Sequence, residues 1–439
     1  MYSLLDNDLY KFTMMQAAFH QFPNTEVAYK FVCRTPGVDL TVFIDALENK
    51  LWQMCETRFT FEELQYLRTI RFMKPDFVNY LENFRLKPSL VRFDKEDGKL
   101  SVRIKGDWVA TILFEVPLLS LISETYMESQ MSPDTLWENG KKNLRAKIQW
   151  YKDNNCTFKY VDFGTRRRMS SKWHGYGVRA FKQELPDVFV GTSNVLLAME
   201  NGLRPIGTMA HEWIQAGQGM EQTRLSGSQA YMLQKWADEY RGDLGVALTD
   251  TISMDAFLKD FDAYFSKLYD GCRHDSGDPI EWGEKLIAHY QKYGIDPMSK
   301  TAVFSDGLNF QECHRIEQHF KGRIKTLYGI GTNLSNDCGI KALSIVIKLI
   351  TVNGHPVAKL SDEPSKTICE DTEFLSYLKK VFNYGLQSRE IQGNLMDTSP
   401  GRAELRKSIQ QIQDKFECSE HEALSKVLDR LVPLYEERG

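Results

Sequence analysis

The chain of 439 residues lacks the features that mark several large classes of protein. Its eight cysteines are scattered and no two form a Cys-x-x-Cys pair, which argues against a disulfide framework and against a thiolate zinc site. No repeat of fixed period is present, so a solenoid or a propeller is not expected. The 55 basic residues are outnumbered by 59 acidic ones, and the lack of a basic excess argues against a nucleic-acid partner.

A leader-like start and a long apolar run are also lacking. The first residues, MYSLLDNDLYKF, contain neither a basic stretch nor an apolar one, so we expect no secretory signal. The most apolar stretch, residues 108–123, contains Glu115 and Pro117 and is too short to span a bilayer. These absences predict a cytoplasmic protein with reduced cysteines and no membrane partner.

The composition, with 42% apolar and 26% charged residues, is that of a globular protein with a core of normal size. Residues 1–125 mix helical and alternating stretches, which predicts an N-terminal α+β domain. Residues 126–369 contain most of the candidate chemistry and are expected to form a second domain. For residues 370–439 we predict a helical segment without chemistry, because Leu424, Leu428 and Leu431 recur at helical spacing.

Between residues 126 and 369, short apolar runs end repeatedly in small or polar clusters, as in FKYVDFGTRRR, DVFVGTSN, AVFSDGLNF and TLYGIGTN. Runs of this kind are typical of parallel strands that are covered on both faces. A doubly wound open sheet would give the same alternation, but it usually concentrates its site at one switch point. Polar clusters after most strands therefore favour an irregular α/β barrel, which collects its chemistry at the carboxyl ends of its strands.

Two groups of residues at predicted strand ends suit a sugar diphosphate. In YGIGTN, Gly329 and Gly331 let the backbone approach an anion and Thr332 adds a hydroxyl, although a tight turn alone would also explain the glycines. Other strands end in carboxylates, one of them beside an arginine. Each aspartate alone could be a helix cap. Together, the aspartates and the arginine would suit Mg²⁺, a diphosphate and ribose hydroxyls. These residues are Asp250, Arg273, Asp275 and Asp306.

Two further strand ends carry an aromatic ring and a histidine. Phe163 offers a stacking face and Arg166 a planar fork for phosphate or carboxylate, with a solvated basic turn as the alternative. His211 stands next to Glu212, which could orient its imidazole. A neutral imidazole there could serve as a nucleophile or proton carrier, and a structural histidine is the alternative.

These segments, in this order, resemble the nicotinate phosphoribosyltransferases, a family of type II phosphoribosyltransferases. The resemblance extends from residues 4–31 (LLDNDLYKFTMMQAAFHQFPNTEVAYKF) to residues 352–362 (VNGHPVAKLSD). It implies an N-terminal α/β sandwich joined to an irregular α/β barrel and completed by C-terminal helices that pack on the N-terminal domain. It also implies a reaction in NAD biosynthesis, in which nicotinate and 5-phosphoribosyl 1-diphosphate give nicotinate mononucleotide and diphosphate.

The resemblance further implies ATP as a co-substrate and Mg²⁺ as a cofactor. The position that matches the family's phosphorylated histidine is His211, and we expect Mg²⁺ on the diphosphate near Asp275 and Asp306. Phe163 would stack on one face of the pyridine ring. Tyr10 would cover the other face from a neighbouring subunit, which implies a homodimer with shared active sites. Further implied contacts to the sugar, the diphosphate, the base and the 5′-phosphate come from Arg166, Arg273, Asp275, Gly329, Gly331 and Thr332.

One position bears on the choice of substrate. Related enzymes that use nicotinamide have an aspartate where this chain has Ser193. An aspartate accepts hydrogen bonds from an amide but repels a carboxylate, whereas a hydroxyl can donate to one, so the serine favours nicotinate. The alternatives are a nicotinamide phosphoribosyltransferase and a non-catalytic nucleotide sensor on the same fold. A barrel lyase would need a Schiff-base lysine, for which Lys348 and Lys359 are the only candidates.

Overall fold

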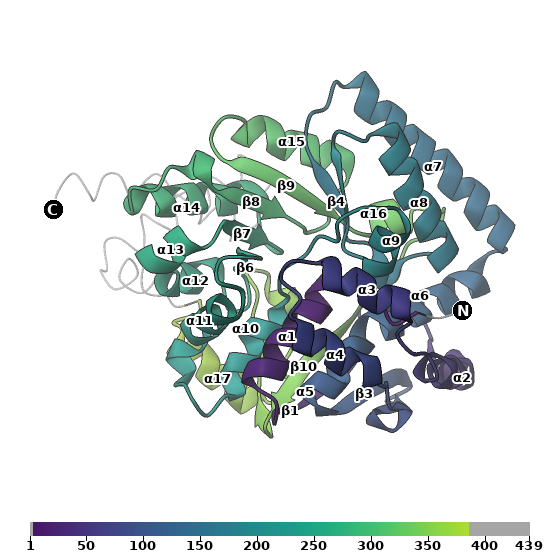
Figure 1. Cartoon of the computed structure of the whole chain (residues 1–439), viewed down its shortest axis with the longest axis horizontal. Coiled ribbons are helices and arrows are strands. Elements are labelled where there is room, and N and C mark those ends of the chain that lie inside the picture. Colours follow the sequence, from purple (N-terminus) through teal and green to yellow (C-terminus); the bar gives the residue numbers. More distant parts are fainter. Residues whose placement is uncertain (1–2, 386–439) are drawn as a thin grey trace, which may run out of the picture. The chain divides into compact units, whose positions relative to one another are not determined.

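The computed structural model describes residues 3–385, and Figure 1 shows how their helices and strands are arranged. The predicted helix around Leu424 lies outside the described residues, as does most of the segment 370–439 and its expected packing on the N-terminal domain. Within that segment the structure describes one helix, α17 (Thr372–Val381).

One of the two sheets is antiparallel, with the strand order β11-β10-β1-β3-β2. Its central strand β1 buries every second side chain, including Val27 and Tyr29, as expected for a strand with one face on the core. Strand β10 pairs with β1 although it lies in the range 126–369, so the chain returns here to the N-terminal sheet. The domain boundaries stay a prediction. The strands are β1 (Glu26–Cys33), β2 (Val91–Glu96), β3 (Lys99–Asp107), β10 (Ile345–Val352) and β11 (His355–Pro356).

The other sheet is parallel, with the order β5-β4-β9-β8-β7-β6. Apart from the β4–β9 pair, neighbours in this order follow one another along the chain, which is the cyclic order of an α/β barrel. The predicted fold class, an irregular α/β barrel with an N-terminal α/β sandwich domain, is confirmed, since the structure has a parallel and an antiparallel sheet. The strands are β4 (Tyr160–Asp162), β5 (Phe189–Thr192), β6 (Val246–Leu248), β7 (Gly271–His274), β8 (Thr301–Phe304) and β9 (Lys325–Ile330).

The ring of strands is irregular between β5 and β6, which share no ladder. A loop fills this gap: Pro205 forms an isolated bridge with Thr192 at the end of β5, and the Thr208 hydroxyl donates to the carbonyl of Val246 in β6 at 2.9 Å. Because proline has no backbone N–H, it cannot continue a ladder. The irregularity predicted for the barrel therefore has a local cause.

Helices alternate with the parallel strands, so that α8 follows β4, α14 follows β7 and α15 follows β8 (Figure 1). Side-chain oxygens of Ser170, Asp278 and Asn309 accept backbone N–H groups at the starts of these three helices, which fixes where each begins. The helices before α17 are α1 (Leu9–Gln21), α2 (Ile44–Cys55), α3 (Phe61–Thr69), α4 (Pro75–Asn83), α5 (Trp108–Thr111), α6 (Glu115–Gln130), α7 (Pro133–Asp153), α8 (Ser171–Glu184), α9 (Val195–Glu200), α10 (His211–Ala216), α11 (Ser228–Tyr240), α12 (Met254–Asp260), α13 (Ala263–Leu268), α14 (Pro279–Lys292), α15 (Phe310–Phe320) and α16 (Thr332–Ser335).

One helical stretch of the described chain, Trp108–Gln130, is long and apolar enough to cross a membrane by length and composition. However, 83% of its most apolar part is buried inside the protein, as in the core helix of a globular domain. Glu115, a buried acidic residue at the start of α6, pairs with the buried ammonium group of Lys11.

A buried ammonium group links the first helix to two other helices. Lys11 of α1 is fully buried, and its Nζ lies 2.5 Å from a carboxylate oxygen of Glu115 in α6 and also pairs with Glu212 in α10. Glu212 in turn accepts hydrogen bonds from the Tyr29 hydroxyl at 2.6 Å and the Trp108 indole at 2.7 Å. Burial alone would lower the pKa of Lys11, but the two carboxylates raise it, so the side chain stays charged.

We expect Lys11→Ala to lower the free energy of unfolding by about 3–5 kcal/mol, because it leaves two carboxylates buried without their cation. Urea denaturation of the purified variant measures this loss. The control is Lys105→Ala, which removes an exposed partner of Glu26 and should cost less than about 1 kcal/mol. Equal losses for the two variants would show that the buried ammonium contributes no more than a surface one.

Candidate active site

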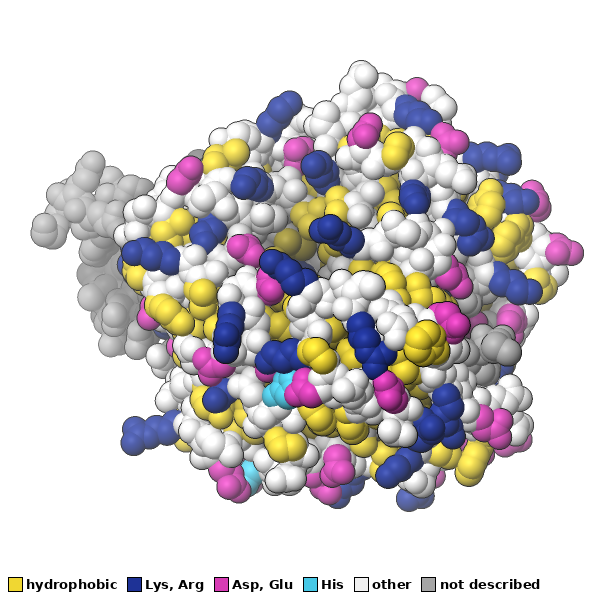
Figure 2. All heavy atoms as spheres, in the orientation of Figure 1, with side chains coloured by type: hydrophobic (Ala, Val, Ile, Leu, Met, Phe, Trp, Pro, Cys, Tyr) yellow, Lys and Arg dark blue, Asp and Glu magenta, His cyan; other side chains and the backbone are white. Residues whose placement is uncertain are grey.

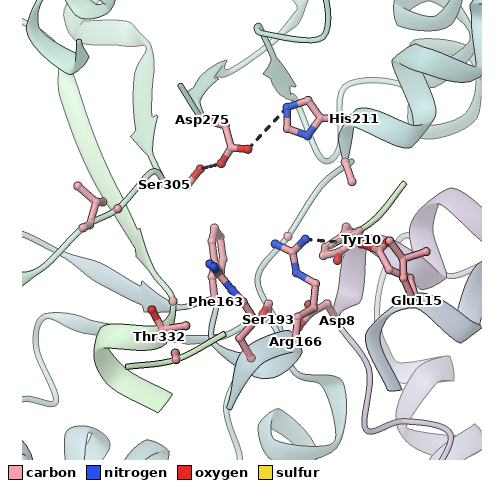
Figure 3. A pocket seen from close by; sticks show the side chains of 18 of the residues that line it. Asp8, Tyr10, Glu115, Phe163, Arg166, Ser193, His211, Asp275, Ser305 and Thr332 are labelled. Atoms are coloured by element: carbon pink, nitrogen blue, oxygen red, sulfur yellow. Dashed lines mark hydrogen bonds and ion pairs between the residues drawn. The ribbon is translucent and has the colours of Figure 1, made fainter. Parts of the chain in front are cut away.

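A cavity of about 390 Å³ lies where the carboxyl ends of the parallel strands face α1 and β10. This volume is in the range of small-molecule sites. Most of the residues predicted from the sequence line this cavity, whereas Gly329, Asp250 and Asp306 are not among its lining residues. The predicted residues that line the cavity are Tyr10, Phe163, Arg166, Ser193, His211, Arg273, Asp275, Gly331 and Thr332. Figure 3 labels most of these residues.

The ring of Phe163 is held against the backbone of β9. A Cβ atom added to Gly329 would lie 2.2 Å from the Phe163 ring, so only glycine leaves room for the ring in this position. The Phe163 backbone N–H also donates to the carbonyl of Ile330 at 2.8 Å. Gly329 therefore acts on the cavity through Phe163 and not by lining it.

A second aromatic ring reaches the cavity from the first helix. Tyr10 lies in the cavity of its own chain, because Leu9 at the start of α1 donates its N–H to the carbonyl of Ser193 at 2.8 Å. The guanidinium of Arg166 lies 5.9 Å from the centre of the Tyr10 ring and 3.6 Å from Glu115. The expectation that a neighbouring subunit supplies this tyrosine stays a prediction, since the structure contains one chain.

His211, at the first position of α10, is oriented by the carboxylate of Asp250, which follows strand β6. Its Nε2 lies 2.7 Å from Asp250, and Asp250 also accepts from Lys359 at 2.8 Å and from Ser276 at 2.6 Å. Burial, and then the ammonium of Lys359, lower the pKa of His211 to about 4, so its imidazole is neutral at pH 7. Burial would raise the pKa of Asp250, but His211 and Lys359 lower it well below its usual value.

The expectation that Glu212 orients His211 is wrong. Neighbouring side chains on a helix do not face each other, and Glu212 points instead to Lys11, Tyr29 and Trp108. The orienting role belongs to Asp250. From the sequence alone, Asp250 could equally have been a helix cap, which is why its pairing with His211 was not foreseen.

The two strand-end carboxylates expected near Mg²⁺ differ in their surroundings. Asp275 lines the cavity, lies 3.6 Å from His211 Nε2 and accepts from the Ser305 hydroxyl at 2.9 Å (Figure 3). Asp306 lies outside the lining and pairs with Lys366 at 2.7 Å. Because Mg²⁺ is usually held by one or two carboxylates together with substrate phosphates, Asp275 fits such an ion directly, whereas Asp306 would first have to leave Lys366.

His211, Asp250 and Asp275 also place three possible ligand atoms within 4.8 Å of one another. This trio does not fit a resident metal ion well. Lys359 already neutralises Asp250, and a cation bound there would have to displace that buried ammonium.

Several buried polar atoms at the cavity have no hydrogen-bond partner among the described residues. They include the Arg273 Nε, the Tyr10 hydroxyl and a side-chain oxygen of Asn333. Buried polar groups are normally paired, so these atoms are available to a polar ligand.

Lys348 of β10 also lines the cavity, and burial together with Lys359 lowers its pKa to about 8.

Two family models match the chain. The model of the nicotinate phosphoribosyltransferase (NAPRTase) family matches residues 158–386, and that of the NAPRTase N-terminal domain matches residues 5–123. The chain belongs to the nicotinate phosphoribosyltransferase family. The predicted resemblance is thereby confirmed.

Individual members of the nicotinate phosphoribosyltransferase family are similar over nearly their whole length. The nicotinate phosphoribosyltransferase of Xanthomonas axonopodis pv. citri is 50% identical over 384 residues, which are 87% of this chain and 97% of the relative. The crystal structure of nicotinate phosphoribosyltransferase from Vibrio cholerae has a TM-score of 0.84 and 38% identity, covering 90% of this chain and 97% of that one. The structure from Porphyromonas gingivalis has a TM-score of 0.82 and 32% identity, covering 87% and 100%.

Several residues that line the cavity of this family member were not predicted from the sequence, and Asp8 is one of them. Asp8 lines the cavity and accepts from the Ser193 hydroxyl at 2.7 Å. Asp8 directly precedes helix α1, and an aspartate at that position has the ordinary explanation of a helix cap. A weak signal was its place two residues before Tyr10, a residue that the resemblance already assigned to the site.

We expect Gly329→Ala to lower the free energy of unfolding by about 1–3 kcal/mol, because the added methyl group overlaps the Phe163 ring. Thermal or urea denaturation measures the change. The matched control is Gly177→Ala in α8, where the nearest atoms to the added methyl lie at 3.9 and 4.0 Å, and where alanine should be neutral or stabilising. A neutral Gly329→Ala would mean that Phe163 is not held by this contact.

Proposed function

We propose that this chain catalyses the transfer of a phosphoribosyl group from 5-phosphoribosyl 1-diphosphate to nicotinate, giving nicotinate mononucleotide and diphosphate in NAD biosynthesis. The observation that carries the proposal is the pairing, in one cavity, of the Phe163 and Tyr10 rings with the cations Arg166 and Arg273. The aromatic rings suit a flat pyridine ring, and the guanidinium groups suit carboxylate and phosphate. The names of the relatives support the same reaction.

In this reaction the pyridine nitrogen forms a bond to C1 of the ribose while the bond from C1 to the diphosphate oxygen breaks. Positive charge develops on the sugar, and the cavity-lining carboxylate of Asp275 can stabilise it. Arg273, whose Nε has no protein partner, can hold the departing diphosphate. Mg²⁺, when bound, would supply charge neutralisation for that diphosphate, with Asp275 as its protein ligand.

We also propose that ATP phosphorylates His211 and that this step accompanies nucleotide formation. The neutral imidazole donates its Nε2–H to Asp250, which leaves the lone pair on Nδ1. That lone pair forms the bond to the γ-phosphorus, and the bond from phosphorus to the bridging oxygen breaks so that ADP leaves. The dianionic phosphoryl group could then improve substrate binding through new cationic contacts.

The homodimer, the cytoplasmic location and the small-molecule partners nicotinate, phosphoribosyl diphosphate and ATP are part of the same proposal. Since Tyr10 lines the cavity of its own chain, a second subunit is not needed to supply the second aromatic ring. Nicotinamide remains the second candidate substrate on a specific observation. The carboxyl group of Asp8, next to Ser193, could accept a hydrogen bond from an amide.

The first test is the choice of base. We expect the purified protein to convert nicotinate in preference to nicotinamide by at least about tenfold in kcat/KM, which corresponds to about 1.4 kcal/mol. Ser193→Asp should move the preference towards the amide, because a second carboxylate would repel the substrate carboxylate. Nucleotide formation from each base gives the ratio, with Ser193→Ala as the uncharged control. Equal turnover of the two bases would contradict the proposal.

The second test is the covalent adduct. Incubation with radiolabelled Mg·ATP should give an acid-labile, base-stable phosphoryl group on His211 and on none of the other histidines. His211→Asn should abolish the adduct and ATP hydrolysis, while some nucleotide formation survives because other residues hold the substrates. The rate of labelling should stay constant from pH 8 down to about pH 5 and fall below that, since the pKa of His211 lies at about 4.

The matched control for the adduct is His174→Asn. His174 is also buried and pairs with a carboxylate, Asp162, at 2.6 Å, but it does not line the cavity. This variant should keep the adduct. Labelling of another residue in the wild-type protein, or undiminished ATP hydrolysis in His211→Asn, would refute the assignment.

A further inference from the structure

Asp8 stands at the position of a helix cap but does not cap its helix. Its backbone has the extended geometry of an N-cap residue before α1, yet its side chain accepts no backbone N–H from that helix. At the same position before α13 and α14, Asp262 and Asp278 each accept two such N–H groups. Asp8 forgoes this stabilising bond and turns its carboxyl group towards Ser193 in the cavity.

The positive charge around Asp8 offsets only part of the effect of its burial. Asp8 is only 2% exposed, and the charged or titratable groups that face it are Arg166, Asp162 and Tyr10, with the hydroxyls of Ser193 and Thr165 completing the shell. Arg166 is shared, because it also faces Glu115 and Asp275. Burial raises the pKa of the Asp8 carboxyl, and Arg166 offsets this only in part.

Ser193 is already committed as a donor. Its hydroxyl proton points to Asp8 Oδ1 at 2.7 Å, so the same proton cannot also be given to a bound carboxylate. The sequence predicted that Ser193 donates directly to the base. Because its proton is engaged, the carboxylate of a bound nicotinate needs a different donor. Figure 3 shows Asp8, Ser193 and Arg166 gathered on one side of the cavity, and Asp8 is the member of this group that can carry an additional proton.

We propose that Asp8 is the specificity-determining residue for the base: protonated, it donates a hydrogen bond to the carboxylate of nicotinate, while Ser193 holds it in place. This inference rests on the proposed function, in which the pyridine ring lies between Phe163 and Tyr10. The proton stays on Asp8 and is shared through the hydrogen bond, so no group is transferred. An ionised Asp8 has the opposite preference, since it repels a carboxylate and accepts from the amide of nicotinamide. The choice between acid and amide consequently depends on pH.

The test is equilibrium binding of nicotinate and of nicotinamide to the whole protein, from mildly acidic to alkaline pH. For the wild-type protein, the Kd of nicotinate should rise towards tenfold per pH unit above the pKa of Asp8, while the Kd of nicotinamide should stay constant or fall. Asp8→Asn should bind nicotinate with a Kd independent of pH up to about pH 7, because its amide N–H donates at every pH. Above that range the loss of the proton from the cavity-lining Lys348, whose pKa is about 8, affects both proteins alike. Asparagine has nearly the size of aspartate and its side-chain oxygen can still accept from the Ser193 hydroxyl, so this variant should fold.

A second variant and a spectroscopic readout separate Asp8 from its neighbour. Ser193→Ala should weaken nicotinate binding but keep the pH dependence, because Asp8 remains. In infrared difference spectra, nicotinate binding to the wild-type protein should show the C=O stretch of a protonated carboxyl group, and Asp8→Asn should lack it. Neither readout depends on turnover or on ATP.

Three results would overturn the inference. The first is that the Kd of nicotinate depends on pH in the same way in the wild type and in Asp8→Asn. The second is that this pH dependence is lost in Ser193→Ala. The third is a loss of nicotinate affinity above about 100-fold in Asp8→Asn at every pH, which would mean that the anion of Asp8 is required. If nicotinate is converted to its nucleotide but its Kd does not depend on pH, only this inference fails. If the wild-type protein binds neither base and forms no nucleotide, the proposed function fails as well.

Discussion

The geometry of the cavity depends on a buried ion pair between Arg168, which follows β4, and Asp6, which precedes α1. The guanidinium donates two hydrogen bonds to the Asp6 carboxylate, at 2.6 and 2.7 Å, and a third to Glu124 at 2.6 Å. This fork holds the start of the chain across the end of the barrel. Asp8 and Tyr10 lie two and four residues further on, and this ion pair, together with the hydrogen bond from the Leu9 N–H to the Ser193 carbonyl, places them opposite the strand ends.

Two of the buried carboxylates around the cavity are paired with buried lysines. Glu115 is paired with Lys11, and Asp250 with Lys359. These pairs are internal, and they leave the neutral imidazole of His211 and the donors of Arg273 available to a ligand. A site that binds phosphate groups needs cations that its own carboxylates do not neutralise. Because lysines pair with Glu115 and Asp250, the arginines of the cavity remain available to a ligand.

Much of the site could be predicted because strand ends are recognisable in a sequence. Phe163, Ser193 and Asp275 each directly follow a parallel strand, and the barrel brings such positions together. The expectation that His211 also stands at a strand end is wrong, because His211 follows the loop that fills the gap between β5 and β6. What could not be predicted are contacts between distant segments whose residues have an ordinary local explanation. Asp8 and Asp250 both have the pattern of helix caps, and only the folded structure shows them turned to Ser193 and His211.

The pairing of β1 with β10 has a consequence for how the protein is made. During synthesis, β1 leaves the ribosome early, whereas β10 follows only after every strand of the barrel has been translated. Until then the β1 edge that β10 will cover offers unpaired N–H and C=O groups to other chains. The nascent N-terminal half is thus a candidate for chaperone protection, and its sheet can be completed only after the barrel sequence has emerged.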